Sequence, residues 1–241
     1  MSLILIIPII ISLAVGAASG AGIVYKWDDI ADALQGKKIA VLGARGVGKT
    51  TLLKYMETGE IEKRHKQTLD KEEVKLKSSI LNNRLNLNNL DIRIKSTYDV
   101  SGDTSAYHVW KKLVDESDLI FYVVKTNILL EDGKDSVTEK RYKDDMYHIG
   151  KWIKESKSKK QLFIVGNHFE SDPNFKKFVN LKQDQIGDFN DAFIRLPTVE
   201  KMIQFAGGLT KVKIVLGSLA DEKYAKQLII AIFTIFLKEE K

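Results

Sequence analysis

The chain has 241 residues and carries 38 Lys plus Arg against 32 Asp plus Glu, a formal net charge of +6. None of these charged side chains lies in the first 25 positions, so about one-third of the remaining residues are charged. That composition is too apolar for a disordered chain and too charged for a protein with many membrane spans, and one globular domain is expected. The absence of Cys excludes disulfide scaffolds and thiolate metal sites. A mildly basic balance suits an anionic membrane surface better than nucleic acid.

The first apolar segment is long enough to cross a bilayer. Residues 3–25 contain no charged side chain, and a helix of that length spans about 34 Å against a hydrocarbon core of about 30 Å. A cleaved signal peptide usually begins with positive charge, and here only the α-amine precedes the apolar run. The small residues between Ala14 and Gly22 resemble a cleavage region, so a signal peptide is the alternative. We expect residues 1–27 to be an N-terminal transmembrane anchor and residues 28–37 to be a linker.

Basic residues set the expected orientation of this anchor. Lys26, Lys37 and Lys38 follow the segment and none precedes it, so the positive-inside rule places the following domain in the cytoplasm. The chain is then expected to be a single-pass protein of the cell membrane, in contact with the lipid bilayer through residues 3–25. Small residues occur at every fourth position of the segment, at Ser12, Gly16 and Gly20. Such a pattern favours close approach of two helices and thus a homodimer, although small residues also occur in spanning helices that do not dimerise.

Four short apolar runs predict the strands of a parallel sheet. They are rich in β-branched and aromatic residues and too short for helices: 38–42, 119–124, 162–166 and 212–216. Between them, apolar residues recur at helical spacing, first at Val109, Trp110, Leu113 and Val114, and later at Tyr142, Met146, Ile149 and Ile153. The alternation of strand and helix predicts an α/β fold with a doubly wound, mainly parallel sheet over residues 38–241.

Three further segments have expected places in this fold. Residues 73–79 and 89–100 flank an Asn-rich stretch and are expected to form an antiparallel hairpin. Residues 228–237 form an apolar run that is short for a membrane span, and we expect it to pack on the sheet as a helix. Residues 171–200 contain several Phe, for which packing on an extra helix is the commoner explanation and partner binding the alternative.

A glycine-rich motif follows the first predicted strand. Residues 43–50 read GARGVGKT and match GxxxxGK[ST], with an apolar strand before them and a helix after them, as the motif requires. Glycines let backbone N–H groups surround a β-phosphate, and the positive end of the following helix adds to the attraction. Lys49 is expected to reach the β- and γ-phosphate oxygens, and Thr50 to bind Mg²⁺. The motif therefore predicts a nucleotide site, with a purely structural turn as the alternative.

Other polar residues follow predicted strands at the same edge of the sheet. Asp99 and Gly102 form a DxxG motif, in which the Asp can hold a Mg²⁺-bound water and the Gly N–H can contact a γ-phosphate. Thr68 lies in a polar stretch where a hydroxyl can join Mg²⁺ when the γ-phosphate is present. Residues 167–170 and 217–219 follow two predicted strands, at the edge where open α/β sheets bind their ligands.

In this order, these segments resemble the Ras-like small GTPases of the translation-factor-related P-loop class, over about residues 37–238. The membrane segment lies outside the resemblance, which is to a prokaryotic-looking, membrane-anchored variety. It implies GTP or GDP with Mg²⁺ as the bound cofactors, and residues 99–102 as the second switch. Four residues would then serve catalysis: Lys49, Thr68, Gly102 and Asp103. Metal ligands would be Thr50, Thr68 and Asp99. The nucleotide would contact Gly43, Arg45, Gly46, Val47, Gly48, Lys49, Thr50, Thr51, Asn167, His168, Glu170, Ser218 and Leu219.

Some positions depart from the usual pattern of this family. The family usually has Asn-Lys-x-Asp where residues 167–170 read Asn-His-Phe-Glu. Glu170 keeps the charge that would read guanine but adds a methylene, and Asp172 is an alternative carboxylate. Where the family often has a Gln that orients the attacking water, this chain has Asp103, which is shorter and anionic, so slow intrinsic hydrolysis is expected. Arg45 either offers its charge to the phosphates or points to solvent.

Together these features predict a membrane-tethered GTP-binding switch that hydrolyses GTP slowly. Its expected partners are the lipid bilayer, a protein effector and an activating protein, and nucleic acid is not among them. Two alternatives differ in class: a nucleotide-loaded membrane scaffold with negligible turnover, and an ATP-using P-loop protein.

Overall fold

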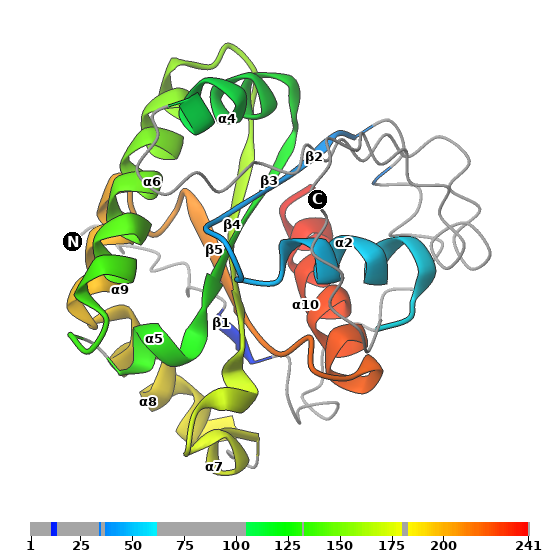
Figure 1. The fold of residues 1–241 in the computed structure, drawn as a ribbon, viewed down its shortest axis with the longest axis vertical. Coiled ribbons are helices and arrows are strands. Elements are labelled where there is room, and N and C mark those ends of the chain that lie inside the picture. Colours follow the sequence, from blue (N-terminus) through cyan, green and yellow to red (C-terminus); the bar gives the residue numbers. More distant parts are fainter. Residues whose placement is uncertain are drawn as a thin grey trace, which may run out of the picture.

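The computed structural model describes residues 11–13, 34, 37–61, 105–131, 133–179 and 183–240. Its strands form one parallel sheet in the order β1-β5-β4-β3-β2 (Figure 1). The strand bounds are β1 Ile11–Leu13, β2 Ile39–Leu42, β3 Leu119–Lys125, β4 Gln161–Asn167 and β5 Val212–Leu216. The predicted parallel α/β sheet is thus confirmed, and the four predicted strands correspond to β2, β3, β4 and β5.

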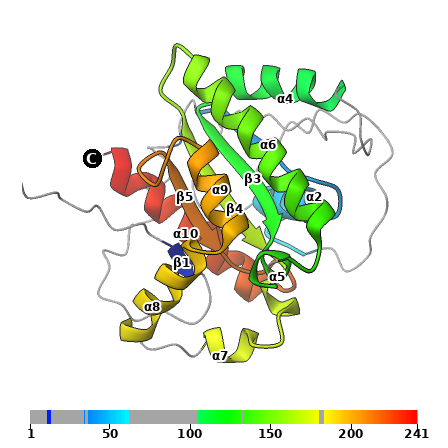
Figure 2. The same cartoon turned by 90° about the vertical axis from the view of Figure 1, so that its left-hand side faces the viewer.

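Helices cover both faces of this sheet. In Figures 1 and 2, α2 and α10 lie on one side of it, and α4, α6 and α9 lie on the other. The helices are α2 Lys49–Thr58, α4 Ser105–Glu116, α5 Thr126–Leu130, α6 Ser136–Glu155, α7 Phe175–Val179, α8 Gln183–Ile194, α9 Pro197–Phe205 and α10 Glu222–Glu240, with a 3₁₀ turn η1 at Phe169–Ser171. A parallel sheet covered on both faces requires strands that are apolar along their length, which explains the apolar runs.

The central strands are buried almost throughout. All residues from Leu119 to Val124 in β3 and from Leu162 to Asn167 in β4 are buried. Phe121 and Phe163 are register partners in these two strands, and their rings pack edge to face with centroids 5.5 Å apart. Such aromatic pairs contribute about 0.5–1.5 kcal/mol beyond the area that they bury. This packing fixes β3 and β4 against each other, and with them the loops at their carboxyl ends.

The predicted helical patterns correspond to α4 and α6. In α4, Trp110, Leu113 and Val114 are buried as expected, whereas Val109 is exposed. The amino end of α6 is capped by Asp135, whose Oδ1 accepts a hydrogen bond from the backbone N–H of Thr138 at 3.0 Å. A side-chain cap of this kind typically stabilises a helix by about 1 kcal/mol. The inner face of α6 packs on the sheet through Tyr142, Met146 and Ile149.

The expected membrane helix over residues 3–25 is not supported. Within that segment the structure describes Ile11–Leu13, which are extended as β1 and pair in parallel with β5 at Ile214–Leu216. Short runs of isoleucine and leucine satisfy a buried strand as well as a spanning helix, so hydropathy alone did not separate the two. The pairing also gives partners to backbone groups along one side of β5. In the part of the chain that is described, no helix combines the length and the apolar character needed to cross a bilayer.

The carboxyl-terminal region packs on the rest of the domain. In α10, the ring of Phe233 lies against Phe121 of β3 with centroids 6.3 Å apart, as expected for a helix that covers the sheet. The Phe residues between 171 and 200 pack ring against ring with one another or with Phe169, which fits the packing explanation: Phe175, Phe178, Phe189 and Phe193. The hairpin expected over residues 73–79 and 89–100 lies outside the described residues.

Candidate functional site

The glycine-rich motif lies between β2 and α2, at the carboxyl edge of the sheet. Gly43, Gly46 and Gly48 have φ angles of +142°, +71° and +99°, which residues with side chains rarely adopt. Gly48 directly precedes α2, and no described side chain caps the amino end of this helix. The first backbone N–H groups of a helix have no partners within it, and the helix dipole places partial positive charge there. The turn therefore presents backbone donors to an anion.

Two of these glycines are packed too closely for a side chain. A Cβ atom on Gly43 would overlap the carbonyl oxygen of Val123 in β3, and one on Gly48 would overlap the side-chain amide nitrogen of Asn167. A Cβ atom on Gly46 would meet no described atom within 4 Å, and Gly46 is exposed. The loop is thus held at both ends against the sheet, and its middle faces outward.

Lys49 begins α2 and folds back over the loop. Its ammonium donates hydrogen bonds to the carbonyl oxygens of Gly43 at 2.6 Å and Ala44 at 2.7 Å. Because the donor is charged, these bonds are stronger than neutral ones, and they fix Nζ beside the turn. A localised positive charge at this point adds to the helix dipole in attracting phosphate oxygens.

Asn167, the last residue of β4, links the glycine-rich loop at residues 43–50, which we call the phosphate loop, to the loop after β5. Its Nδ2 donates to the carbonyl oxygen of Val47 at 2.9 Å, and its Oδ1 accepts from the backbone N–H of Leu219 at 2.9 Å. The side chain is only 3% exposed, so both bonds form away from water. One amide therefore holds two loops in a fixed relation to the end of β4.

The loops after β4 and β5 are also joined through their backbones. The N–H of Gly217 donates to the carbonyl oxygen of Gly166 at 2.8 Å, and the N–H of Phe169 donates to that of Gly217 at 3.3 Å. Ser218 is fully buried, and its hydroxyl oxygen accepts from the backbone N–H of Ala220 at 3.0 Å. The Ser218 side chain thus shapes its own loop from within.

The two candidate carboxylates after β4 have different surroundings. Asp172 is 7% exposed, and its Oδ1 accepts from the backbone N–H of Asn174 at 2.7 Å, which shapes the local turn. Glu170 places Oε1 3.7 Å from Nδ1 of His168, a residue with a left-handed φ of 58°. The Oε2 atom of Glu170 is buried and has no hydrogen-bond partner among the described residues. A buried carboxylate oxygen without a donor is costly unless a ligand supplies one, which favours Glu170 as the residue that meets a base.

The remaining predicted site residues fall into three groups. Arg45 is exposed at the turn, which is compatible with both expected alternatives, and Thr50 is exposed in the first turn of α2 beside the half-buried Thr51. Val47 and Leu219 belong to the hydrophobic core. The residues proposed for the two switches lie outside the described part of the chain: Thr68, Asp99, Gly102 and Asp103. The structure therefore brings together the phosphate loop and the loops after β4 and β5, without either switch.

A buried polar cluster joins α4 to α6 and was not anticipated. Asp145 of α6 is fully buried and accepts hydrogen bonds at 2.9 Å from the hydroxyls of Tyr107 in α4 and Tyr122 in β3. It also accepts from Nε of Arg141 at 2.7 Å. Burial raises the pKa of Asp145, while Arg141 and the two hydroxyls oppose that rise. The sequence signal was a basic and an acidic residue four positions apart on one helix. Because α4 begins two residues after Asp103, the cluster anchors the helix that follows the predicted second switch.

Two solved structures resemble the chain at low sequence identity. The Arl6 BBS3 small GTPase from Trypanosoma brucei, with bound nucleotide analogue GppNp, is 11% identical with a TM-score of 0.46, and the match covers 85% of this chain and 96% of that chain. An ADP-ribosylation factor-like GTP-binding protein, small COPII coat GTPase SAR1, from Encephalitozoon cuniculi in complex with GDP is 15% identical with a TM-score of 0.42, covering 89% of this chain and 88% of that chain. No curated protein matches the sequence.

A family model matches residues 38–170, more than half of the chain. The match runs from the residue before β2 to Glu170, so it contains the phosphate loop and Asn167. The resemblance to Ras-like small GTPases is thereby confirmed at the level of the family. The family is Roc, described as Ras of Complex, Roc, domain of DAPkinase, and the chain belongs to it.

Proposed function

We propose that the chain is a membrane-tethered GTP-binding switch that hydrolyses GTP slowly. The observation that carries the proposal is the phosphate loop: glycines at positive φ, a helix start without a side-chain cap, and Lys49 bonded across the turn. These features concentrate backbone donors and positive charge at one point of the sheet edge. A purely structural turn would need the glycines but not the lysine held over them.

Guanine is the proposed base because of its hydrogen-bond donors. Its ring N–H and its amino group form a donor pair that a carboxylate can accept, and adenine lacks that pair. Glu170 follows the strand that ends in Asn167, and its Oε2 is buried without a described partner. A guanine ring would satisfy this oxygen, whereas Asp172 already accepts a backbone hydrogen bond.

The residues of the first turn of α2 fit a magnesium ion bound with the nucleotide. Mg²⁺ prefers oxygen ligands and usually takes only one or two from the protein. Thr50 is exposed directly after Lys49, and we propose its hydroxyl as one ligand, with Thr68 and Asp99 as further ligands. When bound, the ion supplies neutralisation of phosphate charge.

Slow hydrolysis is proposed from the residue that follows the DxxG motif. Asp103 stands where a Gln would orient the attacking water, and its negative charge is unfavourable beside a γ-phosphate. Intrinsic rates in GTPases that lack a charge-stabilising Arg are on the order of 10⁻⁴ s⁻¹. We therefore expect an activating protein to supply what Asp103 lacks and an effector to read the nucleotide state.

Membrane attachment is proposed from the composition of residues 3–25. An uncharged segment of this length gains much more from transfer into lipid than a three-residue strand gains from one edge of a sheet. We propose that the segment leaves β5 and enters the bilayer where one is present, with the nucleotide-binding domain on the cytoplasmic side. The full chain should then resist carbonate extraction from membranes, and its recovery in the carbonate supernatant would contradict the tether.

A thermal-shift panel tests the nucleotide assignment. GTP or GDP with Mg²⁺ at about 100 times Kd should add roughly 2.7 kcal/mol to the free energy of unfolding and raise Tm by about 5–10 °C. ATP should give a much smaller shift at the same concentration. Equal shifts with ATP would favour the ATP-using alternative, and the absence of a shift with any nucleotide would contradict the proposed nucleotide site. A single-turnover assay then separates a slow GTPase from the scaffold alternative, which predicts no release of phosphate.

A further inference from the structure

A basic pocket lies at the amino edge of the sheet, opposite the phosphate loop. It has a cavity volume of about 780 Å³ and is bounded by the end of α6, the segment before β4, the end of α9 and the residue before β5. Its lining contains no Asp or Glu but includes several lysines: Lys151, Lys154, Lys159, Lys160 and Lys211. Among the described residues, the carboxylates close to these lysines, such as Glu155 beside Lys151, are not part of the lining, so the wall itself is positively charged and favours an anionic occupant.

The lysines differ in how firmly they are held. Lys160 donates to the carbonyl oxygens of Asp115 at 3.0 Å and Ser117 at 2.7 Å, so its ammonium is held at the segment between α4 and β3. Burial lowers the pKa of Lys160. The Nζ atom of Lys151 lies 3.9 Å from a carboxylate oxygen of Glu155, and such an exposed ion pair contributes little to stability. Lys159 and Lys211 are exposed, so their charges are accessible to an external anion.

The pocket also has an apolar side. Its wall includes Ile153, Phe205 and Ala206, and Tyr147 at its border is 49% exposed. Leu209 lies in the turn between α9 and β5, where Gly207 and Gly208 have φ angles of +98° and +97°. The side chain of Leu209 is 40% exposed, although it is a large apolar residue. Positive charge beside exposed apolar side chains matches an amphiphile with an anionic head better than a fully polar anion.

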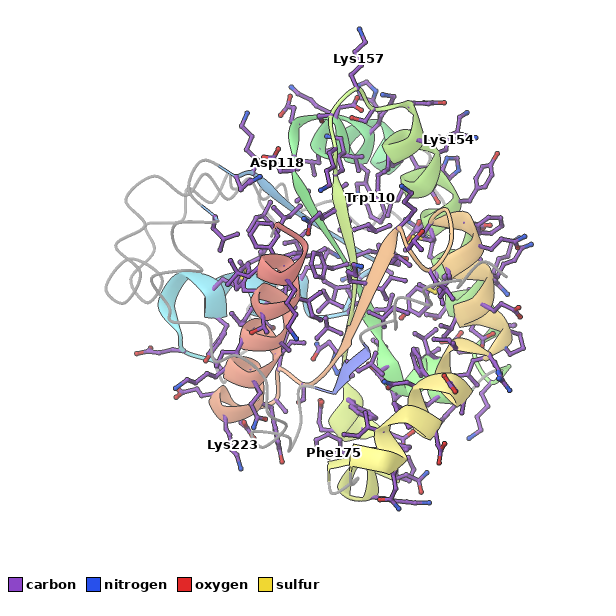
Figure 3. All side chains as sticks on the ribbon, turned by 180° about the vertical axis from the view of Figure 1, so that it is seen from behind. Trp110, Asp118, Lys154, Lys157, Phe175 and Lys223 are labelled. Carbon is purple, nitrogen blue, oxygen red and sulfur yellow. The ribbon has the colours of Figure 1, made fainter. Side chains whose placement is uncertain are left out.

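The position of the pocket fits a surface that faces a membrane. Figure 3 shows Lys154 and Lys157 projecting at the end of the molecule where Asp118 precedes β3, far from Phe175 and Lys223 at the other end. β2 begins at this same edge, directly after the expected linker 28–37, so a tethered chain would enter the domain here. The phosphate loop, at the opposite edge, would remain open to the cytoplasm.

We propose that this pocket and Leu209 bind the headgroup region of anionic phospholipids. The lysines contact lipid phosphate and carboxylate groups, while Leu209 and Tyr147 enter the interface between headgroups and acyl chains. The inference adds a second membrane contact to the tether of the proposed function, and it requires neither nucleotide nor hydrolysis. A soluble phosphorylated molecule and an acidic protein are the competing occupants, and the experiment distinguishes them.

A site-specific fluorophore tests this contact in the full chain. Because the sequence has no Cys, Leu209→Cys provides one labelling site for an environment-sensitive dye. Val137→Cys is the matched position, since Val137 is 79% exposed at the amino end of α6, away from the pocket. We expect the dye on Leu209→Cys to report an apolar environment with vesicles of phosphatidylcholine plus phosphatidylserine, but not with phosphatidylcholine alone. The dye on Val137→Cys should respond to neither.

Charge variants identify the lysines responsible. Lys159→Ser with Lys211→Ser removes two charges from the pocket, and Lys223→Ser with Lys226→Ser removes two from α10 at the other end of the molecule. Each lysine near an anionic surface contributes on the order of a fivefold change in affinity for that surface. The pocket variant should therefore need about 10- to 30-fold more phosphatidylserine for a half-maximal dye response, and the α10 variant should need the same amount as the wild type. High salt should weaken the wild-type response.

The possible outcomes separate this inference from the tether. An equal response with phosphatidylcholine alone, or no response with phosphatidylserine, would overturn the headgroup contact even if carbonate extraction supports the tether. A larger response of the dye on Leu209→Cys to inositol hexakisphosphate or polyglutamate alone than to phosphatidylserine vesicles would overturn the lipid assignment in favour of a soluble anion or an acidic protein.

Discussion

The side-chain amide of Asn167 donates to the backbone carbonyl of Val47 across 120 residues of sequence. Through this bond the last residue of β4 holds the end of the phosphate loop next to α2, and its Oδ1 holds the loop after β5. The position of the phosphate loop is therefore set by tertiary contact as well as by its glycines.

Asn167→Ala should weaken both stability and nucleotide binding. The substitution leaves the carbonyl of Val47 and the N–H of Leu219 without partners in a buried place, which should cost about 2–4 kcal/mol of unfolding free energy. GDP affinity should fall at least about tenfold because the loop loses its support. Urea denaturation and nucleotide titration measure the two effects. Lys140→Ala, at an exposed position of α6, is the control and should change neither by more than about 0.5 kcal/mol.

Gly48→Ala and Gly46→Ala form a matched pair within the loop. Both positions have positive φ, so each alanine should cost about 1–2 kcal/mol in backbone strain. Only Gly48 faces the amide of Asn167, whose two hydrogen bonds prevent it from moving aside. We expect Gly48→Ala to lose nucleotide binding and Gly46→Ala to keep the loop's packing. Equal stability losses in urea denaturation would show that the Asn167 contact adds nothing.

Sequence patterns predicted the sheet and the phosphate loop because both depend on local signals. Apolar runs of strand length and the spacing of Gly43, Gly48 and Lys49 are visible without tertiary structure. The role of Asn167 as a bridge depends on residues that meet only in the fold. The environments of Glu170 and Asp172 likewise differ through burial and hydrogen bonding, which sequence does not show. The apolar start of the chain suited two structures equally, and the three residues described there are a strand.

Glu170→Ala and Asp172→Ala should separate base recognition from loop structure. If the buried Oε2 of Glu170 accepts donors from guanine, Glu170→Ala should reduce the preference for GDP over ADP by about 10- to 100-fold. Asp172→Ala removes the acceptor for the N–H of Asn174, so it should lower Tm and leave the preference intact. Competition binding with GDP and ADP measures this ratio. A loss of preference only in Asp172→Ala would reverse the assignment.

Asp145 should make stability depend on pH in a defined direction. Burial raises its pKa in the folded state above the ordinary value of 3.8, so the folded state binds the proton more tightly than the unfolded state does. The stability that the Asp145 proton contributes is fully present below the pKa of this carboxyl in the unfolded state. It is lost as pH rises through the pKa of the same carboxyl in the folded state. The stability advantage of the wild type over Asp145→Asn should therefore shrink with rising pH and become constant above that window.

Urea denaturation across a pH series checks this sign. At neutral pH we expect Asp145→Asn to cost about 1–3 kcal/mol, since it weakens the hydrogen bonds from Tyr107, Tyr122 and Arg141. Asp144→Asn removes the same charge at the adjacent exposed position and should change stability by less than about 0.5 kcal/mol. An advantage of the wild type that grows as pH rises would show that Asp145 favours the folded state as an anion.

Isothermal titration of the full chain with GTP, GDP and ATP in the presence of Mg²⁺ tests most directly whether the loop between β2 and α2 binds a guanine nucleotide. We predict saturable binding heat at one site for GTP and GDP, a much weaker signal for ATP, and at least about a tenfold loss of affinity in Lys49→Ala. Absence of binding heat for every nucleotide, from wild-type protein that unfolds cooperatively, would contradict the proposed site.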